Sequence, residues 1–167
     1  MNNMKAKVIL FVITAMIMAA CSKTSEDKVT EVFKEYVKTD FGNPDDFIEI
    51  TKIEKPDTID VDRALSLTTG IDSILWVFPE KEQKNYEYRK QQLIEDNPCV
   101  VIYKLNVRIA VGDDKVMRNY WVVEQDGEMK VQDEEPTIDQ MPYSFAEFSK
   151  TLSEMYATFL KAVGEME

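Results

Sequence analysis

The chain has 167 residues, of which 44% are hydrophobic and 31% are charged, and its formal net charge is −11. This length and composition suit one folded domain with a short extension, and they exclude collagen-like, low-complexity and multi-span membrane proteins. The sequence contains no His, which excludes histidine general bases, Ser-His-Asp and Cys-His nucleophile systems, and metal sites that need imidazole.

The first residues have the layout of a secretory signal. Lys5 and Lys7 precede an apolar run from Val8 to Met18, and the chain turns polar at Ser22. The run is shorter than the roughly 20 apolar residues that a membrane-spanning helix needs. We therefore expect a cleaved signal peptide rather than a transmembrane anchor.

The end of this segment, Met18-Ala19-Ala20-Cys21, resembles the lipobox of bacterial lipoproteins, although Met18 stands where the usual motif has Leu. The resemblance implies a lipoprotein signal peptide over residues 1–20, acyl chains such as palmitate on Cys21, and a tether over residues 21–25. Several acyl chains hold a protein stably on a membrane where one does not. We expect a lipid-anchored envelope protein, at the outer membrane or cell surface rather than free in the periplasm, with ordinary secretion as the alternative.

Processing would also change the charge of the chain. Removal of residues 1–20 takes away Lys5 and Lys7 and changes the net charge from −11 to −13. An acidic protein is repelled by phosphate backbones and anionic lipids, so we expect no nucleic-acid partner and membrane attachment only through the acyl groups on Cys21. With Cys21 acylated, Cys99 has no disulfide partner in the chain, and its apolar neighbours predict a small buried side chain.

The first half of the mature chain has one clear helix and one clear strand. Apolar residues recur at three- and four-residue steps over 25–41, which predicts an amphipathic helix with Thr24 or Ser25 as its N-cap. Gly42-Asn43-Pro44 ends this helix, and the Ile-rich residues 47–54 predict a strand.

The sequence predicts the secondary structure of residues 58–98 less clearly. The apolar run over 71–78 fits either a helical turn or a buried strand. Pro79 then begins a charged segment of helix-forming residues, which predicts a helix that stops at Asn97-Pro98.

The clearest pattern begins at Cys99, because every odd position from there to Val111 is apolar. This alternation predicts a long strand with one buried face. A turn over 112–115 would join it to the next strand and pair Val111 with Val116.

Asp126-Gly127 is the strongest short-range hairpin signal in the chain. Its pairing places Val131 beside Val122. Together with the preceding hairpin, it predicts a three-stranded antiparallel meander.

A second helix is expected at the C-terminus. Ser144 and Glu147 have the spacing of a capping box, and apolar residues then recur at steps of three and four. We expect this helix, 145–166, to lie on the sheet. A homodimer seam along the same helix is the less favoured alternative, because coiled-coil stripes are narrower and usually longer.

The polar face of the meander carries the candidate ligand-binding residues, which are Lys104, Asn106, Arg108, Asn119 and Trp121. Trp121 beside Asn106 and Arg108 would stack on and hydrogen-bond a sugar, a peptide or an aromatic ligand. The alternatives are an ordinary solvated sheet face or a second packing face against the 58–98 region.

Catalytic chemistry has little support in the sequence. Carboxylates are numerous, but on the predicted strands only Glu124 stands out, opposite Tyr103, and one acid does not make a glycosidase pair. Asp57, Asp60 and Asp62 lack the spacing of a calcium loop and predict turn residues. Gly-rich phosphate loops, CxxC pairs and nucleophile elbows do not occur. We therefore expect no catalytic residue, metal ligand or cofactor.

The layout of the chain resembles that of small bacterial envelope lipoproteins with a cystatin-like or NTF2-like curved sheet. The features that carry the resemblance are Asn43-Pro44, the hairpin over 99–125 and Asp126-Gly127. The resemblance implies one α+β domain over 26–167, in which an antiparallel curved sheet packs against an N-terminal and a C-terminal helix. The C-terminal helix departs from the simplest form of either fold. The expected function is a non-catalytic binding module for an envelope protein or a small ligand, and the alternative is a carboxylate- or cation-dependent enzyme acting on glycan or peptide.

Overall fold

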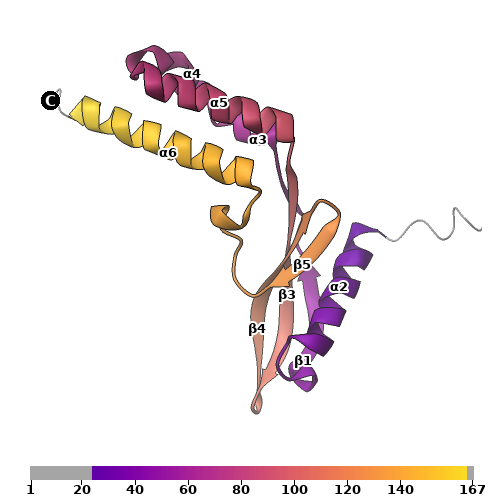
Figure 1. Ribbon diagram of the computed structural model, residues 1–167. Coiled ribbons are helices and arrows are strands. Elements are labelled where there is room, and N and C mark those ends of the chain that lie inside the picture. Colours follow the sequence, from indigo (N-terminus) through magenta and orange to yellow (C-terminus); the bar gives the residue numbers. More distant parts are fainter. Residues whose placement is uncertain (1–23, 165–167) are drawn as a thin grey trace, which may run out of the picture.

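The structure is a computed structural model that describes residues 24–164. The expected signal peptide, the expected lipidation site Cys21 and residues 165–167 lie outside the described residues. The described chain is an α+β fold in which helices flank an open, antiparallel, five-stranded sheet (Figure 1). This architecture confirms the predicted fold class.

The elements agree with most of the boundaries that the sequence predicts. They are α2 (Ser25–Thr39), η1 (Pro44–Asp46), β1 (Phe47–Ile53), β2 (Asp57–Asp60), α3 (Val61–Ser66), α4 (Thr69–Ile74), η2 (Leu75–Val77), α5 (Glu80–Asp96), β3 (Cys99–Val111), β4 (Asp114–Gln125), β5 (Glu128–Gln132), η3 (Ile138–Gln140) and α6 (Tyr143–Gly164). The strand order is β1-β3-β4-β5, and β2 pairs with the first residues of β3.

Helix α2 covers the middle of one sheet face. Thr24 caps it, because its hydroxyl accepts a hydrogen bond from the Asp27 amide while the Asp27 carboxylate accepts one from the Thr24 amide. Its buried residues, Val29, Phe33 and Val37, pack on the odd-numbered apolar positions of β3. We call this the α2 cluster; its sheet members are Tyr103, Leu105, Val107, Ile109, Tyr120 and Val122.

A second hydrophobic cluster lies in the helices α3 to α6, which form a lobe beyond one end of the sheet (Figure 1). Tyr86 and Leu93 of α5 face Phe148 and Leu152 of α6, and the two helices lie side by side. Arg89 and Glu147 join them by an ion pair of 2.8 Å. Val100 on β3 belongs to this lobe cluster, so one strand carries side chains of both clusters.

The first hairpin differs in register from the prediction. Val111 pairs with Asp114 rather than with Val116, so the strands are shifted by two residues. The turn therefore has only two central residues, and Gly112 takes the positive φ of 61° that such a tight turn requires at its first position. A shift of two residues preserves which side chains share a face.

The second hairpin has the predicted register. Gln125 pairs with Glu128 and Val122 with Val131. Asp126 and Gly127 both have positive φ, at 53° and 81°, as a type I′ turn needs at its two central positions. The three-stranded antiparallel meander is confirmed.

The region 58–98 contains more structure than the sequence indicates. Strand β2 and helix α3 are not predicted by any pattern in the sequence. Asp60 accepts a hydrogen bond of 2.9 Å from the Arg63 amide as the N-cap of α3, and Asp57 pairs with the Arg63 guanidinium. Asp57 and Asp60 are therefore the end residues of β2, and Asp62 lies in α3, rather than the turn residues that the sequence predicts; Asp60 also caps α3. The run over 71–78 is helical, since it forms the end of α4 and then η2.

The C-terminal helix differs from the prediction in two respects. It begins at Tyr143, so Ser144 is a buried residue of the first turn rather than the N-cap, and Glu147 binds Arg89 instead of closing a capping box. Its main partner is α5 rather than the sheet. The apolar stripe of α6, which was predicted to pack on the sheet, thus packs mainly against α5 within the lobe.

The prediction for Cys99 is wrong, because this residue is exposed. Cys99 is the first residue of β3 and pairs with Asp60 at the end of β2. It lies at the end of the strand, before Tyr103, where the buried part of the α2 cluster begins. The alternation that buries later odd positions therefore does not bury the first one.

Candidate functional site

The five candidate residues lie on the sheet face opposite α2. The register pairs Lys104 with Trp121, Asn106 with Asn119 and Arg108 with Met117. Trp121 therefore lies opposite Lys104, and its predicted position beside Asn106 and Arg108 is wrong. The error is the same two-residue shift that the tight turn at Gly112 introduces.

Two of the five candidates are held by acids of the neighbouring strand segment. Arg108 forms an ion pair of 2.6 Å with Glu49 on β1, and Asn106 donates a hydrogen bond of 3.1 Å to Glu54. The hydrogen bond from Asn106 lowers the pKa of the Glu54 carboxyl, helped by the charges of Lys104 and Lys52 against a smaller opposing effect of desolvation. This end of the face is therefore an internal polar network whose carboxylate stays ionised.

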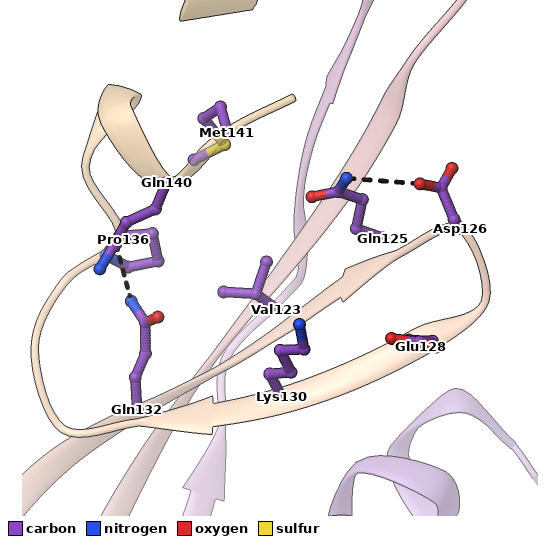
Figure 2. Close-up of a pocket in the computed structure, with 9 residues that line it drawn as sticks. All are labelled: Val123, Gln125, Asp126, Glu128, Lys130, Gln132, Pro136, Gln140 and Met141. Carbon is purple, nitrogen blue, oxygen red and sulfur yellow. Dashed lines mark hydrogen bonds between the residues drawn. The ribbon is translucent and has the colours of Figure 1, made fainter. Parts of the chain in front are cut away.

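The other end of the face carries a pocket of about 420 Å³ between β4, β5 and the loop that leads to α6 (Figure 2). Val123 and Lys130 are directly paired across the two strands at its centre. Pro136 and Met141 close the side toward η3, and Asp126 and Glu128 line the opposite side. The pocket thus lies where the sheet passes into the helical lobe, a common position for ligand sites.

Three glutamine side chains line this pocket, which are Gln125, Gln132 and Gln140. The Gln132 amide group donates to the backbone oxygen of Glu134 at 2.9 Å and to the Gln140 side-chain oxygen at 3.4 Å. The Gln140 oxygen also accepts a hydrogen bond from the Thr137 amide, which caps η3, so the Gln132–Gln140 contact joins the capped η3 to β5. Each side-chain amide has both a donor and an acceptor, so the remaining groups suit a ligand with amides or hydroxyls.

Trp121 is the neighbour of this pocket on β4. It pairs with Gln132 on one side and with Lys104 on the other, and it lies two residues before Val123. Its side chain is half-buried. The candidate aromatic residue is therefore joined to the pocket through Gln132.

Glu124, which the sequence singles out, is on the opposite face from Trp121. Its carboxylate accepts a hydrogen bond of 3.3 Å from the Tyr103 hydroxyl, although Tyr103 pairs directly with Val122. Burial raises the pKa of Tyr103, and the Glu124 charge adds to the effect. Glu124 therefore serves as the hydrogen-bond acceptor for the buried Tyr103 hydroxyl.

The lobe contains a second polar group of residues, which we call the Asp72 cluster: Asp72, Tyr86, Lys90 and Thr68. Burial alone would raise the pKa of the Asp72 carboxyl, but hydrogen bonds from Tyr86, Lys90 and Thr68 and the Lys90 charge together lower it. Burial raises the pKa of Tyr86, and the neighbouring Asp72 adds to that. A stably ionised Asp and a neutral Tyr suit a structural link between α4 and α5.

The described residues form neither a metal cluster nor a membrane-spanning helix. Over residues 24–164, no group of three or more Asp, Glu or Cys side chains is arranged to hold a metal ion. In that same range no helix has both the length and the hydrophobicity to cross a bilayer.

No protein-family model, curated protein or solved structure matches the chain.

Sequence reasoning locates the correct sheet face but misses the pocket on it. Gln125 and Lys130 belong to the predicted hairpin strands. The register at Asp126-Gly127 therefore already predicts that both side chains lie on the same sheet face as Trp121. Pro136, Gln140 and Met141 come from the segment between β5 and α6, which contains the short helix η3. No periodic pattern indicates that this loop returns over the sheet.

Proposed function

We propose that this chain is a lipid-anchored protein of the bacterial cell envelope that binds a small ligand or a segment of a protein without catalysis. The single observation that supports binding most strongly is the pocket between β4, β5 and η3, together with Trp121 beside it. The support for the location is the lipobox-like sequence that ends at Cys21. Acyl groups on Cys21 would hold the protein at the membrane, and the acidic domain would contribute no attraction to it.

The composition of the pocket supports binding over chemistry. Its walls combine the apolar Val123, Pro136 and Met141 with side-chain amides and one ammonium group. Such a mixture orients a ligand through a few polar contacts while apolar surface is buried. The residues that could activate water, Asp126 and Glu128, are exposed at the rim beside a hairpin turn, where a carboxyl group is solvated like an ordinary surface acid.

Two-dimensional NMR of the ¹⁵N-labelled full chain tests the site. The probe is a soluble digest of bacterial cell wall, which contains both glycan and peptide fragments. We expect shifts in the side-chain amides of Gln125, Gln132 and Gln140 and in the Trp121 indole. The Trp76 indole, which is 77% exposed in the lobe, serves as an internal control and should not shift.

A matched variant distinguishes the pocket from a general surface effect. Gln132→Ala removes the amide that joins β5 to η3 and should abolish the shifts, whereas Gln91→Ala on the outer face of α5 should leave them unchanged. Shifts confined to residues outside β4, β5 and η3, or the absence of any shift, would overturn the proposed binding site.

A further inference from the structure

The charge at the centre of the pocket indicates which kind of ligand fits. Figure 2 shows the Lys130 side chain extending into the pocket beside Val123. The ion pairs of residues 24–164 do not include Lys130, whereas Arg108 and Lys52 on the same face contact Glu49 and Glu54. Lys130 thus offers an ammonium group that forms no ion pair with the described carboxylates, although Asp126 and Glu128 line the same pocket.

Lys130 is the one cationic side chain among the residues that line this pocket. At physiological ionic strength, charges more than about 8 Å away are largely screened, so the nearest groups decide the local interaction. A ligand anion within hydrogen-bond distance of Lys130 gains a charge-assisted contact, although the rest of the protein repels it weakly. Asp126 and Glu128 line the same pocket, so a ligand anion gains from its direct contact with Lys130 and not from a positive local field.

The register also places a second lysine on the other side of Trp121. Lys104 pairs with Trp121 directly, and Lys130, the partner of Val123, is a diagonal neighbour of Trp121. Diagonal neighbours on a sheet are about 7–8 Å apart, within reach of long side chains. If a ring or an amide of the ligand stacks on the Trp121 indole, the substituents of that ring or amide lie within reach of Lys130. Lys104 is less available, because its charge also acts on Glu54.

We infer that the pocket takes a ligand with a carboxylate adjacent to an amide. The carboxylate contacts Lys130, and the amide contacts the Gln132 side-chain oxygen and the Gln140 side-chain nitrogen, the two atoms that the hydrogen bond between these glutamines does not use. Both the C-terminal end of a peptide and an N-acylated acidic sugar present this chemistry. The inference rests on the proposed binding function and adds the class of ligand. It requires Lys130 to act as a cation and the glutamines to act as neutral hydrogen-bonding groups.

Two pairs of probes separate these sources. N-acetylmuramic acid differs from N-acetylglucosamine by a substituent that bears a carboxylate. N-acetyl-alanyl-alanine ends in a carboxylate, and its C-terminal amide ends in a neutral carboxamide. The protein is the full chain, purified in detergent, with Trp76→Phe so that Trp121 is the only tryptophan. Trp121 emission during titration reports binding beside the pocket.

We expect the carboxylate member of one pair to bind at least tenfold more tightly than its neutral counterpart, as the loss of a charge-assisted contact predicts. Lys130→Gln should remove this preference, and Lys130→Arg should retain it. Lys115→Gln is the matched control, because Lys115 lies at the far end of β4 opposite Ala110. It removes the same charge and should leave the preference unchanged.

Equal affinity within both pairs would overturn the inference, and so would unchanged Trp121 emission with all four probes. A carboxylate preference that persists in Lys130→Gln would also overturn it. Each of these results leaves the proposed binding function standing if the cell-wall digest still shifts the pocket amides. The loss of those shifts would overturn the proposed function itself.

Discussion

The Tyr86 hydroxyl donates a hydrogen bond of 2.5 Å to Oδ1 of Asp72 and joins α5 to α4 inside the lobe. The Lys90 ammonium is 2.9 Å from the same oxygen, and the Thr68 hydroxyl donates to Oδ2 at 2.9 Å. Tyr86 has no exposed surface. A buried phenol needs a polar partner, and the Asp72 carboxylate provides it.

Tyr86→Phe should therefore destabilise the protein by about 1.5–3 kcal/mol, the usual contribution of a hydrogen bond to a charged group. The ring would keep its stacked contact with Phe148, whose centroid is 6.0 Å away. Urea unfolding at pH 7 measures the change. Tyr88→Phe, at an exposed position of the same helix, is the control, and equal stability of the two variants would contradict the account.

Stability should also depend on pH through Asp72. The pKa of this carboxyl is lower in the folded protein than in the unfolded chain, where it is about 3.9. Its ionised form therefore stabilises the fold at neutral pH, and this contribution is lost as the pH falls below about 4 and through the folded-state value. We expect the stability difference between the native chain and Asp72→Asn to be largest at pH 7 and to shrink toward pH 3.

Other acids contribute equally to both proteins in that comparison, so they cancel. Asp113→Asn alters an exposed carboxyl in the first hairpin turn, controls for the loss of one acidic charge, and should change the stability at pH 7 little. A difference for Asp72→Asn that is constant from pH 7 to pH 3 would show that its charge does not stabilise the lobe.

The two hydrophobic clusters should unfold together, because β3 contributes Val100 to the lobe cluster and Leu105 and Val107 to the α2 cluster. Trp76 lies in the lobe and Trp121 lies in the sheet, so Trp121→Phe and Trp76→Phe give one reporter for each part. Both should show the same urea midpoint. Separate midpoints would show that the lobe and the sheet are independent folding units.

The turn at Asp126-Gly127 should tolerate little change at its glycine. Gly127→Ala places a side chain at φ 81° and should cost about 1 kcal/mol. Gly164→Ala is the matched control at the end of α6, where the backbone is not in the positive-φ region and nothing lies within 4 Å of the added carbon. Thermal unfolding should show a loss for the first substitution only, and equal effects would contradict the assigned turn.

The periodic elements could be predicted because each buries one face. The steps of three and four before Phe41 and the alternation after Cys99 are direct consequences of helix and strand geometry, and α2 and β3 follow them. Asp126-Gly127 fixes its own register, since both residues take positive φ. The turn at Gly112 has one such glycine, which leaves its length open to an error of two residues.

Helix α3, strand β2 and the pocket depend on tertiary contacts that no local sequence pattern indicates. Helix α3 has only six residues and is held by its Asp60 cap and by the lobe, and β2 exists only through its pairing with β3. The pocket likewise needs η3 to return over β5 through the contact of Gln140 with Gln132. Such contacts join residues whose spacing in the sequence carries no pattern.

The most direct test of the central claim is the intact mass and membrane partition of the full chain expressed in a bacterium, compared with Cys21→Ala. The account predicts that the native chain loses residues 1–20, gains the mass of acyl groups and sediments with membranes, whereas Cys21→Ala does none of these. Release of the native chain without acyl mass would contradict the lipid-anchored account, and Cys21 would then be a free thiol available to pair with the exposed Cys99.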